Sequence, residues 1–231
     1  MIVITGGTKG IGRALVERFA EARHNIAVCA RNAEDLATLK AEIEETHLVE
    51  VHTKPTDVSD KAQVLDFGEF VLQLGEPIDA LINNAGVFLP GKVEEEEEGA
   101  LETMINTNLY SAYHLTRKLL PAIKEQKTGD IFNMCSIASL IAYPHGGSYS
   151  ISKFALYGMS KVLREEMKPH GIRVFSVLPG ATYTASWEGS GFDEERLMPA
   201  TDIAEAVFSA FSMSSRTVVE DIVLRPQLGD L

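Results

Sequence analysis

The sequence predicts an α/β fold, a single domain with a doubly wound sheet of about seven mostly parallel strands and helices on both faces. Short runs of β-branched and apolar residues alternate with longer amphipathic segments along the chain, which is the order of βαβ units. A glycine-rich turn joins the first run to the first amphipathic segment, a connection typical of such sheets. The chain has 231 residues, 45% of them hydrophobic, so we expect one core and one domain over residues 1–231.

Each apolar run predicts a strand, and each segment with a 3.6-residue rhythm predicts a helix. We expect strands at residues 1–5, 25–30, 48–53, 78–82, 130–135, 172–180 and 217–226. We expect helices at about residues 11–24, 33–47, 61–75, 97–126, 149–168 and 201–213. Ser59 and Thr201 are expected to cap the third and the last helix. Residues 185–199 mix glycine, charge and aromatic side chains without periodicity, which favours a mobile lid.

The composition excludes several classes of protein. The net charge of −12, from 33 acidic and 21 basic residues, would repel a phosphate backbone, so no nucleic-acid partner is expected. No run approaches the roughly 20 apolar residues of a membrane span. The first residues predict a strand and carry no leader pattern, so we expect a cytoplasmic protein with no membrane partner.

No metal site is predicted from the sequence. Cys29 and Cys135 each lie in an apolar run without a second cysteine or a histidine at ligand spacing, and we expect both to be reduced core residues. The five glutamates at residues 94–98 are explained by solvation near a helix start, where negative charge is favoured.

The glycine-rich turn predicts a phosphate-binding site. Gly6, Gly10 and Gly12 give the spacing G-x-x-x-G-x-G between the first strand and a helix that starts near Ile11. Glycines let the backbone approach a pyrophosphate, whose charge is favoured at a helix N-terminus.

The charges beside this turn indicate which dinucleotide binds. Enzymes that use NAD carry an acidic residue about 20 residues after the turn, whereas here Arg31 follows the second strand and Lys9 lies within the turn. Two cations suit a 2′-phosphate, so the sequence predicts NADP(H). The alternative is that both are ordinary surface charges.

Three further residues lie where strands are expected to end. Asp57 follows the third strand and is expected to reach an adenine amino group. Asn84 follows the fourth strand as a cross-linking amide beside the cofactor, and Gly86 would let the chain pass close to the adenine ribose. A plain turn is the alternative for this second motif.

A candidate catalytic group lies between residues 135 and 153. Tyr149 and Lys153 are four residues apart in a helical pattern, so both point to one side. A cation beside the phenol would lower its pKa from about 10 toward neutrality. Ser136, at the end of the fifth strand, could donate to the same substrate oxygen. Asn108, in the middle of a helix, is either satisfied structurally or holds a water relayed to Lys153.

Six motifs together resemble the short-chain dehydrogenase/reductase family, of the NADP-preferring type. They are TGGTKGIG at 5–12, NNAG at 83–86, Asn108 within INTNLYSA, Ser136, YSISK at 149–153 and PGATYT at 179–184. The resemblance implies a Rossmann-type sheet, a nicotinamide cofactor and a catalytic tetrad of Asn108, Ser136, Tyr149 and Lys153. It also implies a homodimer or a homotetramer. The expected cofactor contacts are Gly6, Thr8, Lys9, Gly10, Ile11, Gly12, Arg31, Asn32, Asp57, Val58, Asn84, Ala85, Gly86, Tyr149, Lys153, Pro179, Gly180, Thr182 and Thr184.

The leading functional hypothesis is therefore an NADP(H)-dependent enzyme that reduces a carbonyl group of a small molecule, or catalyses the reverse reaction. One alternative is a 3-oxoacyl-carrier-protein reductase, for which basic residues would have to attract an acidic carrier: Arg117, Lys118, Lys124 and Lys127. A second alternative is a protein that senses NADP(H) without chemistry. The presence of all four tetrad residues argues against the sensor.

Overall fold

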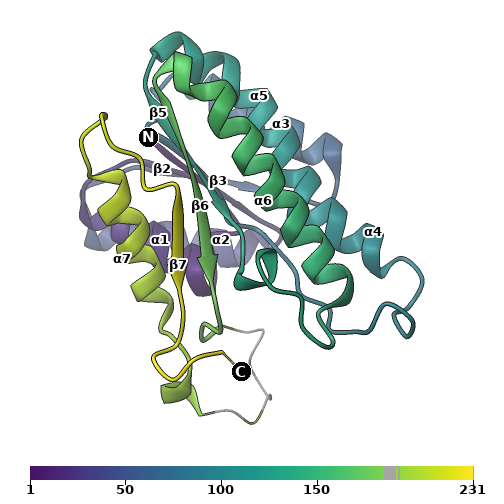
Figure 1. The fold of residues 1–231 in the computed structure, drawn as a ribbon. Helices are drawn as coiled ribbons and strands as arrows, with labels where there is room; N and C mark the ends of the chain where they lie inside the picture. The colour runs from purple at the N-terminus through teal and green to yellow at the C-terminus, as the bar shows by residue number, and fades with distance from the viewer. Residues whose placement is uncertain (185–190, 192, 231) are drawn as a thin grey trace.

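A computed structural model describes residues 1–184, 191 and 193–230. Seven strands form one sheet in the order β3-β2-β1-β4-β5-β6-β7, and every neighbouring pair is parallel (Figure 1). The strands are β1 (Ile2–Thr5), β2 (Ile26–Ala30), β3 (Val51–Pro55), β4 (Ala80–Asn83), β5 (Gly129–Met134), β6 (Ile172–Pro179) and β7 (Asp221–Leu224). The predicted doubly wound sheet is confirmed.

The direction of winding reverses between β1 and β4. The chain moves outward from β1 to β3, and β4 then pairs with the other side of β1. Ligands of open parallel sheets bind outside the carboxyl ends of the strands at such a switch point. The glycine-rich turn follows β1 and the NNAG motif follows β4, so the fold brings these two motifs together.

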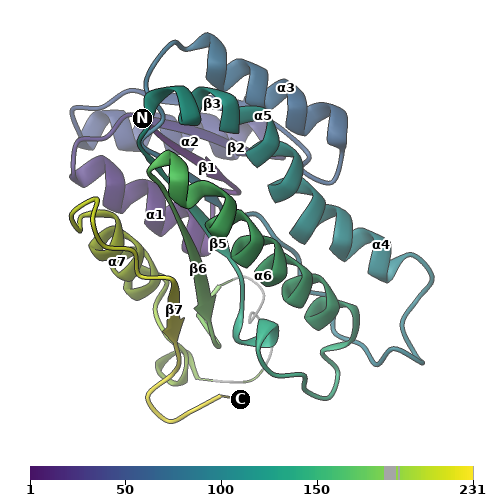
Figure 2. The same cartoon turned by 45° about the horizontal axis from the view of Figure 1, so that its top comes forward.

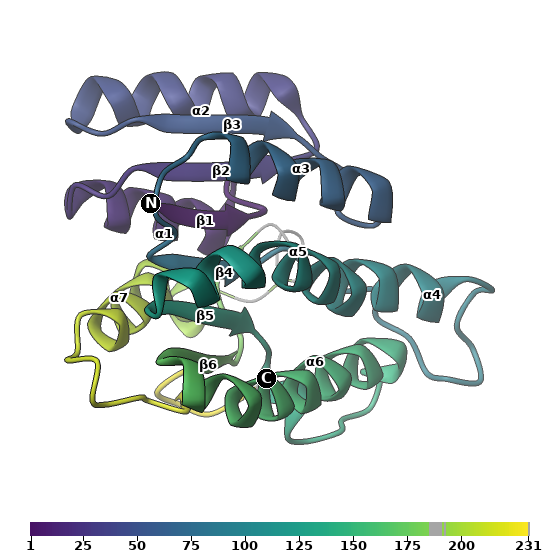
Figure 3. The ribbon, with the colours of Figure 1, turned by 90° about the horizontal axis from the view of Figure 1, so that it is seen from above.

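Helices cover both faces of the sheet (Figure 3). One face carries α1 (Gly10–Glu21), α2 (Ala33–Thr46) and α7 (Ala200–Phe211), and the other carries α3 (Lys61–Gln73), α5 (Ser111–Gln126) and α6 (Gly147–Met167). The strands are buried on both sides, which explains their continuous apolar runs. Phe132 of β5 and Phe175 of β6 stack with ring centroids 4.1 Å apart in the middle of the sheet.

Several predicted elements have different boundaries, among them the seventh strand, which begins at Asp221 instead of residue 217. The third strand begins at Val51 instead of residue 48, because Leu48 lies in the turn after α2 and is 86% exposed. The helix expected over 97–126 is divided into α4 (Ala100–Ile105), a π-helical turn (Asn106–Tyr110) and α5. Gly99 precedes α4 in the left-handed region, with φ of 88°, so the glutamates before it lie outside the helix.

Both predicted caps are wrong. Asp60 caps α3 by accepting a hydrogen bond from the Ala62 amide at 2.7 Å, while the Ser59 hydroxyl donates to Asp57. Thr201 lies inside α7, whose N-cap is Pro199. Helix starts that shift by one or two residues, as these do, are not fixed by the local sequence.

Part of the expected lid lies outside the described residues, namely 185–190 and 192. In its described part a short 3-10 turn, Glu194–Arg196, is capped by Asp193. An isolated parallel bridge pairs Thr182, just after β6, with Met198. Among the described helices, none combines the length and the apolar character that a membrane crossing requires.

Candidate active site

The glycine-rich turn has a backbone that needs glycine. Gly6 and Gly10 have φ of 69° and 53°, and a Cβ atom on Gly12 would clash with the carbonyl oxygen of Gly6. The first turn of α1 contains no acidic residue, and its N-cap, Lys9, makes no side-chain cap. The helix therefore presents free amides beside a backbone that a ligand can approach closely, which fits a bound pyrophosphate.

A cavity of about 440 Å³ adjoins this turn, lined by Thr8, Lys9, Gly10, Arg13, Asp35, Thr38, Tyr183 and Thr184. The Lys9 ammonium pairs with Asp35 at 3.1 Å. Arg31 is exposed just after β2, and Asn32 caps α2 by accepting from the Glu34 amide at 2.7 Å. The side-chain oxygen of Asn32 is thus already used by the helix, whereas the guanidinium of Arg31 faces solvent.

Asp57 is also engaged within the chain. Its carboxylate accepts from the Ser59 amide at 2.9 Å and from the Ser59 hydroxyl at 2.7 Å. Val58 packs against the core on the side of α3. These bonds orient the Asp57 carboxylate within the turn, and its contact with adenine stays a prediction.

The NNAG motif links the ends of β1 and β4. The Asn84 side-chain amide donates to the carbonyl oxygens of Thr5 and Gly6 at 2.9 and 3.0 Å. The Thr5 hydroxyl accepts from the amides of Asn84 and Ala85 at 3.1 and 3.0 Å. These four bonds hold the crevice at the switch point in one geometry. Gly86 faces the side chains of Asn108 and Lys153, so the motif reaches two of the candidate catalytic residues.

Tyr149 and Lys153 lie in the first two turns of α6. The Lys153 ammonium is 5.7 Å from the centroid of the Tyr149 ring and donates to the carbonyl oxygen of Met134 at 2.8 Å. Phe88, from the loop after β4, meets the Tyr149 ring edge to face at 4.9 Å. The phenol is thus held between the ammonium and an aromatic wall.

Burial decides the charge state of this pair. Burial raises the pKa of the Tyr149 phenol, and its hydrogen bond with Ser136 opposes that shift only in part. Burial lowers the pKa of the Lys153 ammonium to about 8. The sequence predicts a pKa below the ordinary value of a phenol, whereas in this structure burial holds the pKa of Tyr149 above that value.

Ser136 lies where β5 ends and a 3-10 turn (Ile137–Ser139) begins. Its hydroxyl accepts from the Ala138 amide at 3.1 Å and lies 3.5 Å from the carbonyl oxygen of Pro179. Ser136 thereby caps the turn, and this cap fixes the direction of its hydroxyl beside Tyr149.

Asn108 is satisfied structurally. It is 1% exposed and lies in the π-helical turn. Its oxygen accepts from the Val87 amide at 2.7 Å, and its nitrogen donates to the Val87 carbonyl oxygen at 3.0 Å and to Ser152 at 2.9 Å. Both amide hydrogens are used, so of the two possibilities for its side chain the structure supports the structural one.

Three of the candidate catalytic residues line one cavity of about 350 Å³. Its lining includes Ser136, Tyr149, Lys153 and, among the predicted cofactor contacts, Ile11, Asn84, Gly86, Pro179, Gly180, Thr182 and Thr184. Its outer wall is mostly apolar and aromatic, with Phe88, Ile137, Ile141 and Tyr143. Thr184 also lines the cavity beside the glycine-rich turn, so the two cavities adjoin.

Residues 1–195 match the family model described as short chain dehydrogenase. The chain belongs to the short-chain dehydrogenase family. It is 36% identical to a sepiapterin reductase of Chlorobaculum tepidum over 240 aligned positions, which cover 100% of this chain and 98% of that relative. This membership makes the protein an oxidoreductase.

Two solved structures support the same assignment. An alcohol dehydrogenase from Thermococcus sibiricus, complexed with 5-hydroxy-NADP, has a TM-score of 0.92 and 28% identity over 100% of this chain and 97% of that chain. A serine dehydrogenase complexed with NADP+ has a TM-score of 0.88 and 26% identity over 100% and 97%. The Rossmann-type fold expected for a short-chain dehydrogenase is confirmed.

Sequence reasoning missed three residues that organise the site of this dehydrogenase. The Ser139 hydroxyl donates to the Lys153 carbonyl oxygen at 2.9 Å and ties the turn after β5 to α6. Thr5 fixes the NNAG motif, as described above. The Phe88 ring packs on the Tyr149 ring. All three act through contacts between distant segments, for which local patterns carry no signal.

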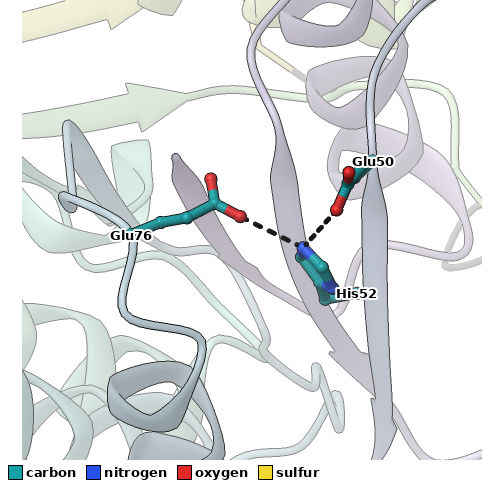
Figure 4. A group of neighbouring side chains, drawn as sticks. All are labelled: Glu50, His52 and Glu76. Atoms are coloured by element: carbon teal, nitrogen blue, oxygen red, sulfur yellow. Dashed lines mark hydrogen bonds and ion pairs between the residues drawn. The ribbon is translucent and has the colours of Figure 1, made fainter.

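A separate cluster lies at the other end of the dehydrogenase sheet (Figure 4). The His52 imidazole lies between the carboxylates of Glu50 and Glu76, at 3.6 and 3.3 Å. Among the described residues this is the one group with donors spaced for a metal ion. The Asn25 amide donates to Glu76 at 3.0 Å. The cluster joins β3 to the segment before β4, at the amino ends of the strands.

Proposed function

We propose that this short-chain dehydrogenase uses NADP(H) to reduce a carbonyl group of a small molecule to an alcohol, with Tyr149 as the general acid, or catalyses the reverse reaction. One observation carries the proposal. Tyr149, Ser136 and Lys153 line a single cavity that adjoins, at Thr184, a cavity at the glycine-rich turn. The proposed proton donor, Tyr149, and the proposed nucleotide-binding turn therefore lie in adjoining cavities at the switch point of the sheet.

The residues present fit the cofactor. Gly6, Gly10 and Gly12 leave room for a pyrophosphate at the start of α1, and Lys9 and Arg31 suit a 2′-phosphate. The complexes of the relatives with NADP or NADPH agree with this choice. NADPH supplies the hydride when it is bound.

The protein's own residues would manage the proton and the orientation. The Ser136 hydroxyl would donate to the carbonyl oxygen and hold it beside Tyr149. As negative charge develops on that oxygen, the Tyr149 O–H bond breaks and its proton completes the alcohol. The resulting phenolate would be stabilised by Lys153, which is charged at neutral pH because its pKa is about 8.

Cofactor preference gives a direct test of the nucleotide assignment. Asp35 already pairs with Lys9, so we expect Arg31 to make the larger contribution to binding the 2′-phosphate. Arg31→Ala should weaken NADPH about tenfold to hundredfold, as expected for loss of a charge-assisted contact, and should change NADH binding less than about twofold. Fluorescence titration of both nucleotides measures this, with the exposed Arg216→Ala as control. Equal affinities of the wild type for NADPH and NADH would contradict the assignment.

The cavity favours a small carbonyl compound over an acyl group on a carrier protein. The walls are aromatic and aliphatic, which suits a ketone, an aldehyde or a short 3-oxoacyl group. The basic surface needed for an acidic carrier is reduced, because Lys118 pairs with Glu69 at 2.6 Å. All four tetrad residues are present, which argues against a sensor without chemistry.

A homodimer or a homotetramer is part of the proposal. Large apolar side chains are exposed on α5, on α6 and in the turn between α4 and α5: Tyr110, Tyr113, Ile151, Phe154 and Val162. We expect Phe154→Glu, which places a charge within this surface, to shift the protein to a smaller species in light scattering after size exclusion. Leu48→Glu, at an exposed site near β3, is the control. An unchanged mass for the Phe154 variant would rule out this face as the contact.

A further inference from the structure

The run of five glutamates contains one member that is not solvated like the others. Four of the side chains from Glu94 to Glu98 are exposed, and Glu96 is half-buried. Figures 1 and 2 show the segment that leads into α4 beside the start of α6. Gly91 pairs with Gly146 in a parallel bridge, and the Gly91 amide donates to the His145 carbonyl oxygen at 3.0 Å. The glutamate run is thus docked on the helix that carries Tyr149.

The Glu96 carboxylate supplies a cap that α6 lacks. The N-cap of α6, Gly146, has no side chain, and the first turn contains no acidic residue. Glu96 accepts a hydrogen bond from the Ser148 amide at 2.7 Å and a second one from the Ser148 hydroxyl. A carboxylate at this position satisfies a free amide and complements the helix dipole. It comes from 52 residues away in the chain, so it was not visible in the local pattern.

The packing leaves no room for other side chains around this carboxylate. A Cβ atom on Gly147 would clash with the Glu96 carboxylate, and one on Gly91 would lie 2.6 Å from its Cγ atom. Ser148 itself is 2% exposed. The two glycines and the buried serine pack closely around the Glu96 side chain, which distinguishes this contact from a chance pair at the surface.

The docked loop also carries the wall of the active site. Phe88 packs against the Tyr149 ring at 4.9 Å, and its neighbour Val87 is held by Asn108. Glu96 anchors the other end of the same loop to Ser148, the residue before Tyr149. The phenol and its aromatic wall are therefore held together by one anchor at Asn108 and one at Glu96.

We propose that Glu96 is a positioning residue for Tyr149, which it serves by capping α6 at Ser148 and by fixing the Phe88 loop against the phenol. The proposal rests on the proposed reductase function for its kinetic consequence. Its structural part, the protection of the first turn of α6, stands independently of any substrate.

The test compares two neighbouring glutamates. Glu96→Ala should lower kcat for carbonyl reduction by about tenfold to hundredfold, because a small misplacement of a catalytic group has an effect of this size, and should leave the Kd for NADPH within about twofold. Glu95→Ala is the control, since Glu95 pairs with Lys92 at the exposed surface, at 2.7 Å, and should keep the wild-type kcat. Glu96→Gln retains an oxygen for the Ser148 amide and should restore most of the activity.

Hydrogen exchange separates this inference from the proposed function. The Ser148 amide should exchange faster in Glu96→Ala than in the wild type, while amides in the last turns of α6 keep their protection. A wild type that turns over normally, with a Glu96→Ala variant equal to it in kcat and in exchange at Ser148, would overturn the inference. A wild type without turnover would count against the reductase proposal, and faster exchange in the variant would still support the cap.

Discussion

Replacement of Tyr149 by phenylalanine should lower kcat for carbonyl reduction by about 10²- to 10⁴-fold, the range for loss of a general acid. The phenol, which we propose as the proton donor, lies beside Ser136 in the cavity, and phenylalanine keeps the ring that packs on Phe88. The Kd for NADPH should therefore change little. Steady-state kinetics and a binding titration on the same preparation measure the two quantities.

A second tyrosine in the same cavity provides the matched control. Tyr143 also lines the pocket. At Tyr149 a hydrogen bond with Ser136 opposes part of the effect of burial, whereas burial raises the pKa of the Tyr143 hydroxyl to about 12, so Tyr143 is the poorer proton donor. Tyr143→Phe should keep kcat within a few-fold of the wild type. If the Tyr143 variant lost activity and the Tyr149 variant kept it, the assignment of the general acid would be wrong.

Replacement of Lys153 by methionine should stabilise the fold at neutral pH while it abolishes turnover. Lys153 is 4% exposed, and burial lowers its pKa from 10.5 to about 8. Below pH 8 the lysine is charged in both the folded and the unfolded chain, so the folded state carries the desolvation cost, about 3 kcal/mol. Methionine removes that cost, and loss of the hydrogen bond to Met134 offsets about 1 kcal/mol of the gain.

The stability gained by Lys153→Met should depend on pH. Between pH 8 and 10.5 the unfolded wild type binds more protons than the folded one, so the free energy of unfolding of the wild type rises with pH in that window. The advantage of Lys153→Met should therefore be largest at pH 7 and shrink toward pH 10.5. Urea unfolding at several pH values measures it, with the exposed Lys161→Met on the same helix as control. A variant that is less stable than the wild type at pH 7 would contradict the burial argument.

The sheet could be predicted because its signals are local. Each strand is a continuous apolar run that fits burial on both faces, and the glycine-rich turn places the first strand next to the first helix. The misplaced third strand shows the limit of this reasoning. Val49 and Leu48 look like strand residues, but the pairing of Val51 with Ile26 sets the register, and pairing is a property of the assembled sheet.

Residues of the candidate site could be predicted where their spacing within one helix or one turn is enough to place them. Tyr149 and Lys153 share a face of α6 because of their spacing, and Gly12 is needed by the turn itself. The roles of Asn108 and Glu96 were not predictable in this way. Their partners, Val87 and Ser148, are 21 and 52 residues away, so only the folded chain brings the groups together.

Consumption of NADPH by the purified protein against a panel of carbonyl compounds tests the central proposal most directly. The panel should include diketones, aldehydes, quinones, sugars and 3-oxoacyl thioesters, with Tyr149→Phe measured alongside the wild type. We expect turnover of at least one class by the wild type and its loss in the variant. Tight binding of NADPH without turnover of any member, or turnover that is equal in the variant, would contradict a tyrosine-dependent carbonyl reductase.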